Sequence, residues 1–239
     1  IDLSYNRELQ KLYLEYQIDK INLEQNIKLK EIMLRLSKES KNLNFSHLTN
    51  LEIIESGHSE IENIILPSSI KKIKLEWNKI SSITLPDGIE DVNLNGNKIK
   101  NIVIPSSVKN LYLENSDITD ITLPEGIVNV DVSDNNLTNL HIPNSVKYLD
   151  ASSNKISNII LPNGIKRVSL NDNELESIDL PEGVEFVDLS KNKLTNLAIP
   201  SSIKDLYAWH NNISNDIVVP NGIEKLYLNE NKISKIILS

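Results

Sequence analysis

Histidine, serine and carboxylate side chains are the groups in this chain that could carry out catalysis, but their spacing argues against it. The four histidines stand at unrelated places and form no HExxH pair: His47, His58, His141 and His210. Ser69 and Lys72 match a Ser-x-x-Lys pattern. Serine and lysine also recur at these positions of the sequence repeat, so chance explains the match better than a catalytic role. There is no glycine-rich phosphate loop, and the absence of cysteine excludes thiol nucleophiles and Cys-ligated metals. We therefore expect a protein that is not an enzyme and that uses no cofactor or metal.

The composition narrows the class of partner. Among 239 residues, 25 are basic and 33 acidic, which gives a net charge of −8. An acidic chain is poorly suited to a phosphate backbone, so we expect no nucleic-acid partner. No apolar run approaches the ~20 residues of a membrane helix, so we expect no membrane insertion. The chain begins with Ile1 and its one methionine is Met33, which indicates a segment of a longer or processed product.

A repeat dominates the sequence. The nine prolines stand at positions 67, 86, 105, 124, 143, 162, 181, 200 and 220, and such a fixed period of roughly 20 residues is typical of a solenoid. If each unit is numbered from its proline, positions 7 and 9 are apolar, as in Val92 and Leu94. This alternation predicts a short strand with one face turned inward.

Position 12 is asparagine in eight of the nine units, with Ser116 as the exception. An amide donates and accepts hydrogen bonds at once. Stacked asparagines could therefore satisfy backbone groups where each coil leaves its strand, and the pattern predicts such a ladder.

Residues 1–47 differ from the rest and predict a helical cap. Apolar residues recur there at helical spacing in two sets: Leu9, Leu12, Tyr13 and Tyr16, then Leu29, Ile32, Met33 and Leu36. Asn22 followed by Gln25 resembles a capping box. We expect two helices, near residues 5–20 and 23–39, with one continuous helix as the alternative. Their apolar stripe would cover the open end of the solenoid, and a coiled-coil site is the minority interpretation.

The remainder, residues 48–239, predicts one degenerate unit followed by nine repeats with the spacing of the prolines. The recurring string L-P-x-[S/G]-I-x-x-L-x-L-x-x-N-x-I-x-x-I, seen in residues 85–103 and 180–198, resembles a leucine-rich repeat. Its opening Leu-Pro resembles the LPX type found in secreted bacterial effectors, the group of Yersinia outer protein M and the invasion plasmid antigen H ligases. The resemblance implies an α+β repeat solenoid with short parallel strands on the concave face and an N-terminal helical cap. Two departures are that Leu-Pro occurs once per unit here and that the catalytic cysteine of the ligases is absent.

Because positions 7 and 9 face inward, positions 6, 8, 10 and 11 should line the concave face. The candidate partner-binding residues are Asp131, Tyr148, Asp150, Arg167, Asp172, Phe186, Asp188, Tyr207, Trp209, His210 and Tyr227. Asp131 and Asp150 should lie on adjacent strands about 4.8 Å apart and form an acidic centre. Tyr207, Trp209 and Tyr227 should form an aromatic anchor. Plain solvation of the sheet is the alternative for the aspartates, and a calcium site at Asp131, Asp134 and Asp150 is a minor one.

These features predict a non-catalytic protein-binding scaffold whose partner has a basic or amide-rich surface. The resemblance implies a bacterial effector, or its recognition domain, that is secreted into the host cell and engages a host protein. One alternative is the substrate-recognition domain of a larger ubiquitin ligase, since the last coil would lie bare at Ser239. A surface or adhesion protein is the other alternative.

Overall fold

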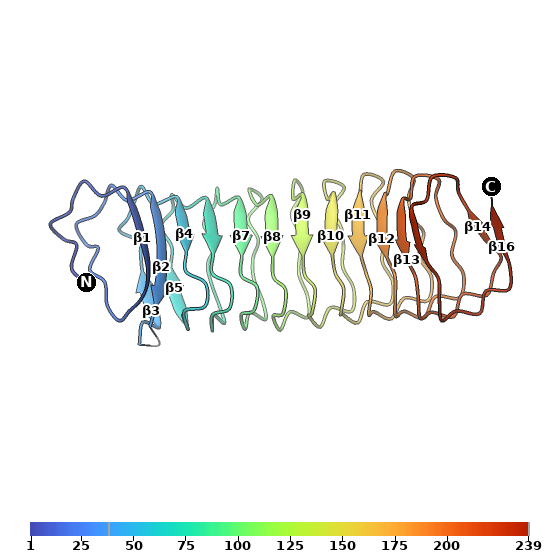
Figure 1. Cartoon of the computed structure of the whole chain (residues 1–239). Helices are drawn as coiled ribbons and strands as arrows, with labels where there is room; N and C mark the ends of the chain where they lie inside the picture. The colour runs from blue at the N-terminus through green and yellow to red at the C-terminus, as the bar shows by residue number, and fades with distance from the viewer. Residues whose placement is uncertain (38, 239) are drawn as a thin grey trace. The chain divides into compact units, whose positions relative to one another are not determined.

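The computed structural model describes residues 1–37 and 39–238, with the backbone alone for residues 16 and 17. The chain divides into two compact units, Ile1–Ile118 (unit 1) and Thr119–Ser239 (unit 2). Every regular element among the described residues is a β-strand (Figure 1). The expected α+β class is therefore wrong, and the fold is a parallel β-solenoid.

In unit 1, six strands form a parallel sheet in the order β1-β2-β4-β6-β7-β8, and β3 pairs with β5 away from it. The strands are β1 (Lys11–Ile18), β2 (Glu31–Leu36), β3 (Asn42–Asn44), β4 (Ile53–Glu55), β5 (Asn63–Ile65), β6 (Lys72–Lys74), β7 (Asp91–Asn93) and β8 (Asn110–Tyr112).

In unit 2, the parallel sheet runs β9-β10-β11-β12-β13-β15, and β14 pairs with β16. The strands are β9 (Asn129–Asp131), β10 (Tyr148–Asp150), β11 (Arg167–Ser169), β12 (Phe186–Asp188), β13 (Asp205–Tyr207), β14 (Ile217–Val219), β15 (Lys225–Tyr227) and β16 (Ile236–Leu238).

The strands of the proline-containing repeats form where the sequence predicted them, because apolar residues alternate there. Position 7 is the central residue of each three-residue strand, and Val168 and Val187 are completely buried at this position. Position 9 follows directly after the strand, and Leu170 and Leu189 are completely buried as well. The side chains at positions 6 and 8 consequently point away from the core.

The two helices expected over residues 5–20 and 23–39 are wrong, and so is a single continuous helix. These residues contain β1 and β2, which pair in parallel with Lys11 opposite Glu31. β2 pairs in turn with β4, with Ile32 opposite Ile54. The expected helical cap is therefore a continuation of the solenoid sheet of unit 1.

The helical spacing of the apolar residues has another origin. Leu29 lies in the turn before β2, and Ile32, Leu34 and Leu36 alternate inward from the strand; all four are buried. Leu29 in the turn and Ile32, the first inward residue of the strand, are three positions apart, which is close to the spacing of one helical turn. Period-2 alternation then follows, and pairing with neighbouring coils favours the strand.

The expected capping box at Asn22 is a turn. Asn22 Oδ1 accepts a hydrogen bond from the Glu24 N–H at 3.1 Å. The same local bond recurs at equivalent places in the coils before and after it, from Ser4 to Asp2 and from Ser46 to Asn44, each at 3.0 Å. These are Asx turns, a side-chain-to-backbone pattern that competes with helix formation.

The asparagine ladder is confirmed. Asn154 Oδ1 accepts from the Leu137 N–H at 2.9 Å, and its Nδ2 donates to the carbonyl oxygens of Val132 at 3.0 Å and Ala151 at 3.2 Å. One side chain thus serves its own coil and the preceding one. The same set of contacts recurs at Asn78, Asn97, Asn173, Asn192, Asn211 and Asn231.

We expect Asn154→Ala to lower the free energy of unfolding by about 1–3 kcal/mol, because buried backbone groups would lose their partners. The matched control is Asn158→Ala, an exposed position in the same coil, which should cost less than about 0.5 kcal/mol. Chemical denaturation of both variants measures the difference, and equal losses would contradict the structural role of the ladder.

The exception in the ladder predicts a stabilising substitution. Ser116 Oγ is buried and has no hydrogen-bond partner within the described parts of the chain. By the geometry of Asn97, which serves Ile80 and Leu75, an asparagine at 116 would reach the Ile99 N–H and the Leu94 carbonyl. Ser116→Asn should therefore raise the free energy of unfolding by about 1 kcal/mol. Chemical denaturation measures the change. The reciprocal Asn97→Ser should lower it, and a loss of stability in both variants would contradict the analogy.

Candidate protein-binding face

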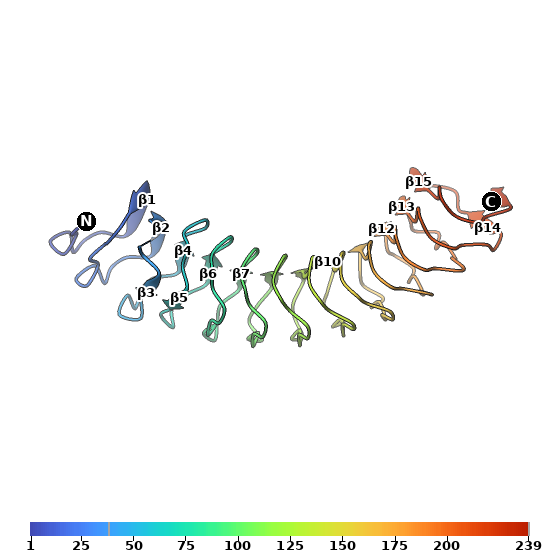
Figure 2. The same ribbon diagram turned by 90° about the horizontal axis from the view of Figure 1, so that it is seen from below.

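The outward side of the parallel sheet in unit 2, which we call the strand face, carries the candidate residues. Parallel pairing without register shifts stacks equivalent positions of successive coils directly beside one another. Figure 2 shows β10, β12, β13 and β15 following one another along this unit. Residues one repeat apart in sequence therefore become neighbours about 4.8 Å apart.

Asp131 and Asp150 form an acidic pair at the beginning of this face, since they lie opposite each other on β9 and β10. Asp131 Oδ1 accepts from the Ser133 N–H at 3.0 Å and from its hydroxyl at 2.6 Å. Asp150 makes the same two bonds to Ser152, at 3.0 and 2.6 Å. One oxygen of each carboxylate thus closes a local turn, while Oδ2 has no hydrogen bond within the described residues.

The pKa of one member of the acidic pair, Asp131, is raised above the ordinary carboxyl value. Burial raises the pKa of the Asp131 carboxyl, and the charges of Asp150 and Asp134 raise it further. The hydrogen bonds from Ser133 act in the opposite direction and lower the pKa, but do not cancel the effect of burial. The charged form of Asp131 is therefore disfavoured unless a cation approaches.

Phe186, Tyr207 and Tyr227 form an aromatic row on β12, β13 and β15. The rings of Tyr207 and Tyr227 stack with centroids 4.8 Å apart and planes 7° apart. Phe186 lies 5.7 Å from Tyr207, although Asp188, not Phe186, is the register partner of Tyr207. This diagonal contact joins position 6 of one coil to position 8 of the next, which the repeat pattern did not predict.

Cations border the aromatic side chains. The Arg167 guanidinium lies 4.2 Å above the centre of the Phe186 ring, and Lys191 Nζ lies 5.3 Å from the centre of the Trp209 ring. Both separations are within the range of cation–π attraction. The sequence analysis missed Lys191, although Lys191 occupies position 11, the same position as His210 in the next coil.

The predicted anchor of Tyr207, Trp209 and Tyr227 divides into two parts. The tyrosines stack, whereas the ring of Trp209 lies with its centroid 6.3 Å from that of His210 and the two planes 69° apart. In the described structure, no ring contact joins Trp209 to either tyrosine. His210 Nδ1 in turn lies 2.6 Å from Glu230 Oε2. Trp209 is thus a separate, half-buried feature beside the aromatic row.

The remaining candidates take different places. Tyr148 is 47% exposed and lies opposite Arg167. Asp188 continues the acidic column, with Oδ1 accepting from the Ser190 N–H at 2.9 Å. Asp172 lies outside the strands, in a left-handed turn with φ of 58°. The structure therefore places Asp172 at the margin of the strand face.

The sequence analysis also missed an ion pair on this face. Lys225 Nζ lies 3.1 Å from Asp205 Oδ2, and the two residues are register partners on β15 and β13. Both occupy position 6, so reading that column two coils beyond Phe186 would have found them.

Metal binding finds no support in the geometry. The described residues contain no group of three or more His, Cys, Asp or Glu side chains arranged to hold a metal ion, so Asp131, Asp134 and Asp150 do not form one. Within the same residues, no helix is long and apolar enough to cross a membrane.

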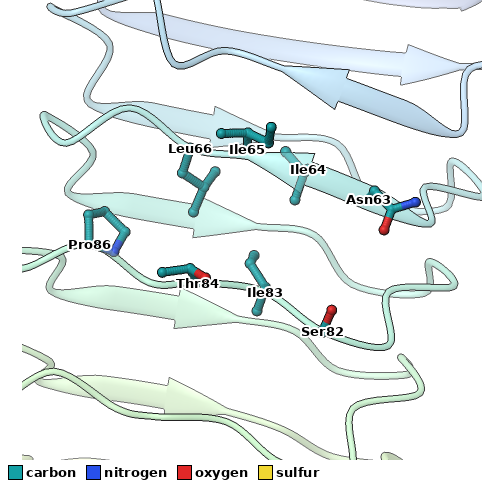
Figure 3. Close-up of a pocket in the computed structure, with 8 residues that line it drawn as sticks. All are labelled: Asn63, Ile64, Ile65, Leu66, Ser82, Ile83, Thr84 and Pro86. Carbon is teal, nitrogen blue, oxygen red and sulfur yellow. The ribbon is translucent and has the colours of Figure 1, made fainter.

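A cavity of about 500 Å³ lies away from the strand sheet in unit 1 (Figure 3). It opens between β5 and the segment 82–84, and its walls carry Ile64, Ile65 and Pro86 but no charged side chain. Its polar lining residues are Asn63, Ser82 and Thr84, with no acid, base or cation beside them, so the strand face is the better candidate site.

Comparison with known proteins supports the fold. No protein-family model matches the chain, and no curated protein sequence matches it significantly. Among solved structures, the leucine-rich effector YopM of Yersinia pestis is similar with a TM-score of 0.71 and 20% identity, over 100% of this chain and 67% of that one. The leucine-rich-repeat domain of APL1 is similar with a TM-score of 0.78 and 16% identity, over 95% of this chain and 69% of that one. An internalin of Listeria monocytogenes, InlF, is similar with a TM-score of 0.73 and 16% identity, over 98% of this chain and 81% of that one. The chain thus has a leucine-rich-repeat fold.

Because the pKa of Asp131 is raised, removing the charge of this carboxyl should stabilise the fold by an amount that depends on pH. Ionised Asp131 opposes folding near pH 7, and this penalty disappears as the pH falls through the raised pKa toward the ordinary carboxyl value of about 4. Asp131→Asn keeps the Oδ1 acceptor for Ser133, so it should stabilise the protein at pH 7 and give no gain below about pH 4.

Thermal unfolding at the two pH values tests this expectation. Asp188→Asn is the matched control, because its register partners are Ser169 and Tyr207 and not a carboxylate. An equal gain for Asp131→Asn at both pH values would contradict the assigned cause.

Proposed function

We propose that this chain is a non-catalytic protein-binding scaffold that engages its partner through the strand face of unit 2. The observation that supports the proposal best is the aromatic row, because Tyr227 keeps 47% of its surface exposed at the end of a stack of rings. Solubility does not require aromatic side chains, whereas interfaces are enriched in them. The leucine-rich-repeat proteins that resemble this chain in fold are consistent with a binding role.

The partner should present a basic or amide-rich surface to the acidic pair. Two carboxylates about 4.8 Å apart repel each other, and a cation or an array of amide N–H groups would relieve that repulsion. The acidic pair repels the phosphates of nucleic acids, so a protein is the favoured partner.

For the biological setting, we favour a bacterial effector, or its recognition domain, that acts on a host protein. The Leu-Pro units and the similarity to the Yersinia effector support this choice. The similarity to the internalin supports a surface or adhesion protein as the second candidate. If this chain were instead the substrate-recognition domain of a larger ubiquitin ligase, that ligase would itself be an effector, so this alternative is compatible with the effector proposal.

The experiment is to recover partners with the full chain carrying a photo-crosslinking residue at Ser169, in the centre of the strand face. Asn158, exposed in an adjoining coil but away from the strands, carries the crosslinker in the control. A partner that crosslinks only from position 169 supports the proposal. Crosslinking only from position 158 contradicts it.

With that partner, the two features of the face should affect different rate constants. Asp131→Asn combined with Asp150→Asn should slow association and flatten its salt dependence, because steering acts on encounter. Trp209→Ala should speed dissociation, by about 30-fold if it is a hot spot of about 2 kcal/mol. Surface plasmon resonance at two salt concentrations measures both, and wild-type kinetics for both variants would exclude the strand face.

A further inference from the structure

We infer that the strand face recognises two features of one partner segment: a basic side chain at the acidic pair, and an aromatic or aliphatic side chain four strands further along at the aromatic row. This inference rests on the proposed function and adds the chemistry and the spacing of the partner. It follows from three observations on unit 2.

The first observation is that the acidic pair has acceptor capacity left. In both Asp131 and Asp150, Oδ1 is engaged by the following serine, and Oδ2 makes no hydrogen bond within the described residues. Two free oxygens on adjacent strands can both accept hydrogen bonds from one guanidinium or ammonium group, each of which carries several N–H donors. A cation there would also offset the repulsion between the two carboxylates, which gives a basic side chain an advantage over a neutral one.

The second observation is that the aromatic row presents ring edges. Arg167 covers one face of Phe186, and Tyr207 lies between Phe186 and Tyr227. The faces of Tyr207 and Tyr227 are turned toward each other, whereas Phe186 is tilted by 45° relative to Tyr207 and has one face covered by Arg167. A flat ligand that stacks on ring faces would find little room, whereas ring edges carry partial positive charge and accept the face of an aromatic side chain.

The third observation is the separation of the two features. The acidic pair lies on β9 and β10, and the two stacked tyrosines lie on β13 and β15, in the sheet order β9-β10-β11-β12-β13-β15. Four strand steps of about 4.8 Å separate their midpoints, which gives about 19 Å. An extended segment spans this distance in about six residues at about 3.3 Å each. A helix needs about 11 or 14 residues, the spacings that return to the same face.

The arrangement also fixes which end of the segment carries which side chain. Arg167 lies on the face of Phe186, whereas the charge of Lys225 is offset by Asp205. The guanidinium of Arg167 repels a basic side chain from the Phe186 end of the aromatic row. The basic residue of the partner should therefore lie toward β9 and the aromatic or aliphatic residue toward β15.

The test uses a displayed library of random peptides, about 20 residues long so that a helix can span both features, selected on the immobilised full chain. Selected peptides should carry Lys or Arg together with an aromatic or aliphatic residue, at the extended or helical spacing given above. Each feature is then examined by a double-mutant cycle. Replacing the basic residue of the peptide by Ala should weaken binding about tenfold to the wild type, but hardly at all to the Asp131→Asn, Asp150→Asn variant.

The aromatic or aliphatic residue should show the same coupling to Tyr207→Ala and none to the aspartate variant. Circular dichroism of each purified variant checks that the fold is retained, and Phe186→Leu serves as a milder substitute if Tyr207→Ala loses it. Peptides weakened by strand-face substitutions but without these couplings, or without a preferred spacing, would overturn the two-point inference alone. Peptides insensitive to every strand-face substitution, or no selected peptide at all, would contradict the proposed function itself.

Discussion

The structure depends on the asparagine that follows the strand in eight of the nine proline-containing repeats. Where a coil leaves the sheet, its backbone groups and those of the preceding coil turn toward the interior, where water cannot satisfy them. Asn173, for example, accepts from the Ile156 N–H and donates to the Ala151 and Leu170 carbonyls. A side chain with one acceptor and two donor hydrogens serves all these groups, and because it bridges two coils it constrains the length of the repeat.

The fixed length of the repeat also determines how the side chains of the strand face are arranged. Once register is fixed, outward side chains one repeat apart stand in rows, and the chemistry of each row depends only on which residues occupy it. In the aspartates, Oδ1 closes the turn at Ser133 or Ser152, and Oδ2 is left for the partner that we propose. The acidic column is therefore partly explained by local structure, and the stacked tyrosines form a cross-strand pair that stabilises the sheet while leaving Tyr227 half exposed.

Much of the candidate site followed from the period alone. Outward positions were deduced from the inward pair at positions 7 and 9, and the adjacency of Asp131 and Asp150 followed from it. The diagonal contact of Phe186 with Tyr207 and the cover of Phe186 by Arg167 did not. Such contacts depend on side-chain rotamers and on mutual attraction across strands, which a repeat pattern does not contain.

From residue 67 onward, the sequence was enough to predict the solenoid, its period, the strands centred on position 7 and the ladder, because prolines, asparagines and apolar pairs recur there at a fixed interval. It did not predict β14 and β16, which pair with each other outside the main sheet. The state of residues 1–37 and 39–47 depended instead on pairing in three dimensions. The local spacing of Leu29, Ile32 and Leu36 suits a helix, and a strand formed because β2 can pair with both β1 and β4. Hydrogen bonds and burial between neighbouring coils outweigh local helical preference, and a single stretch of sequence read on its own does not show those neighbours.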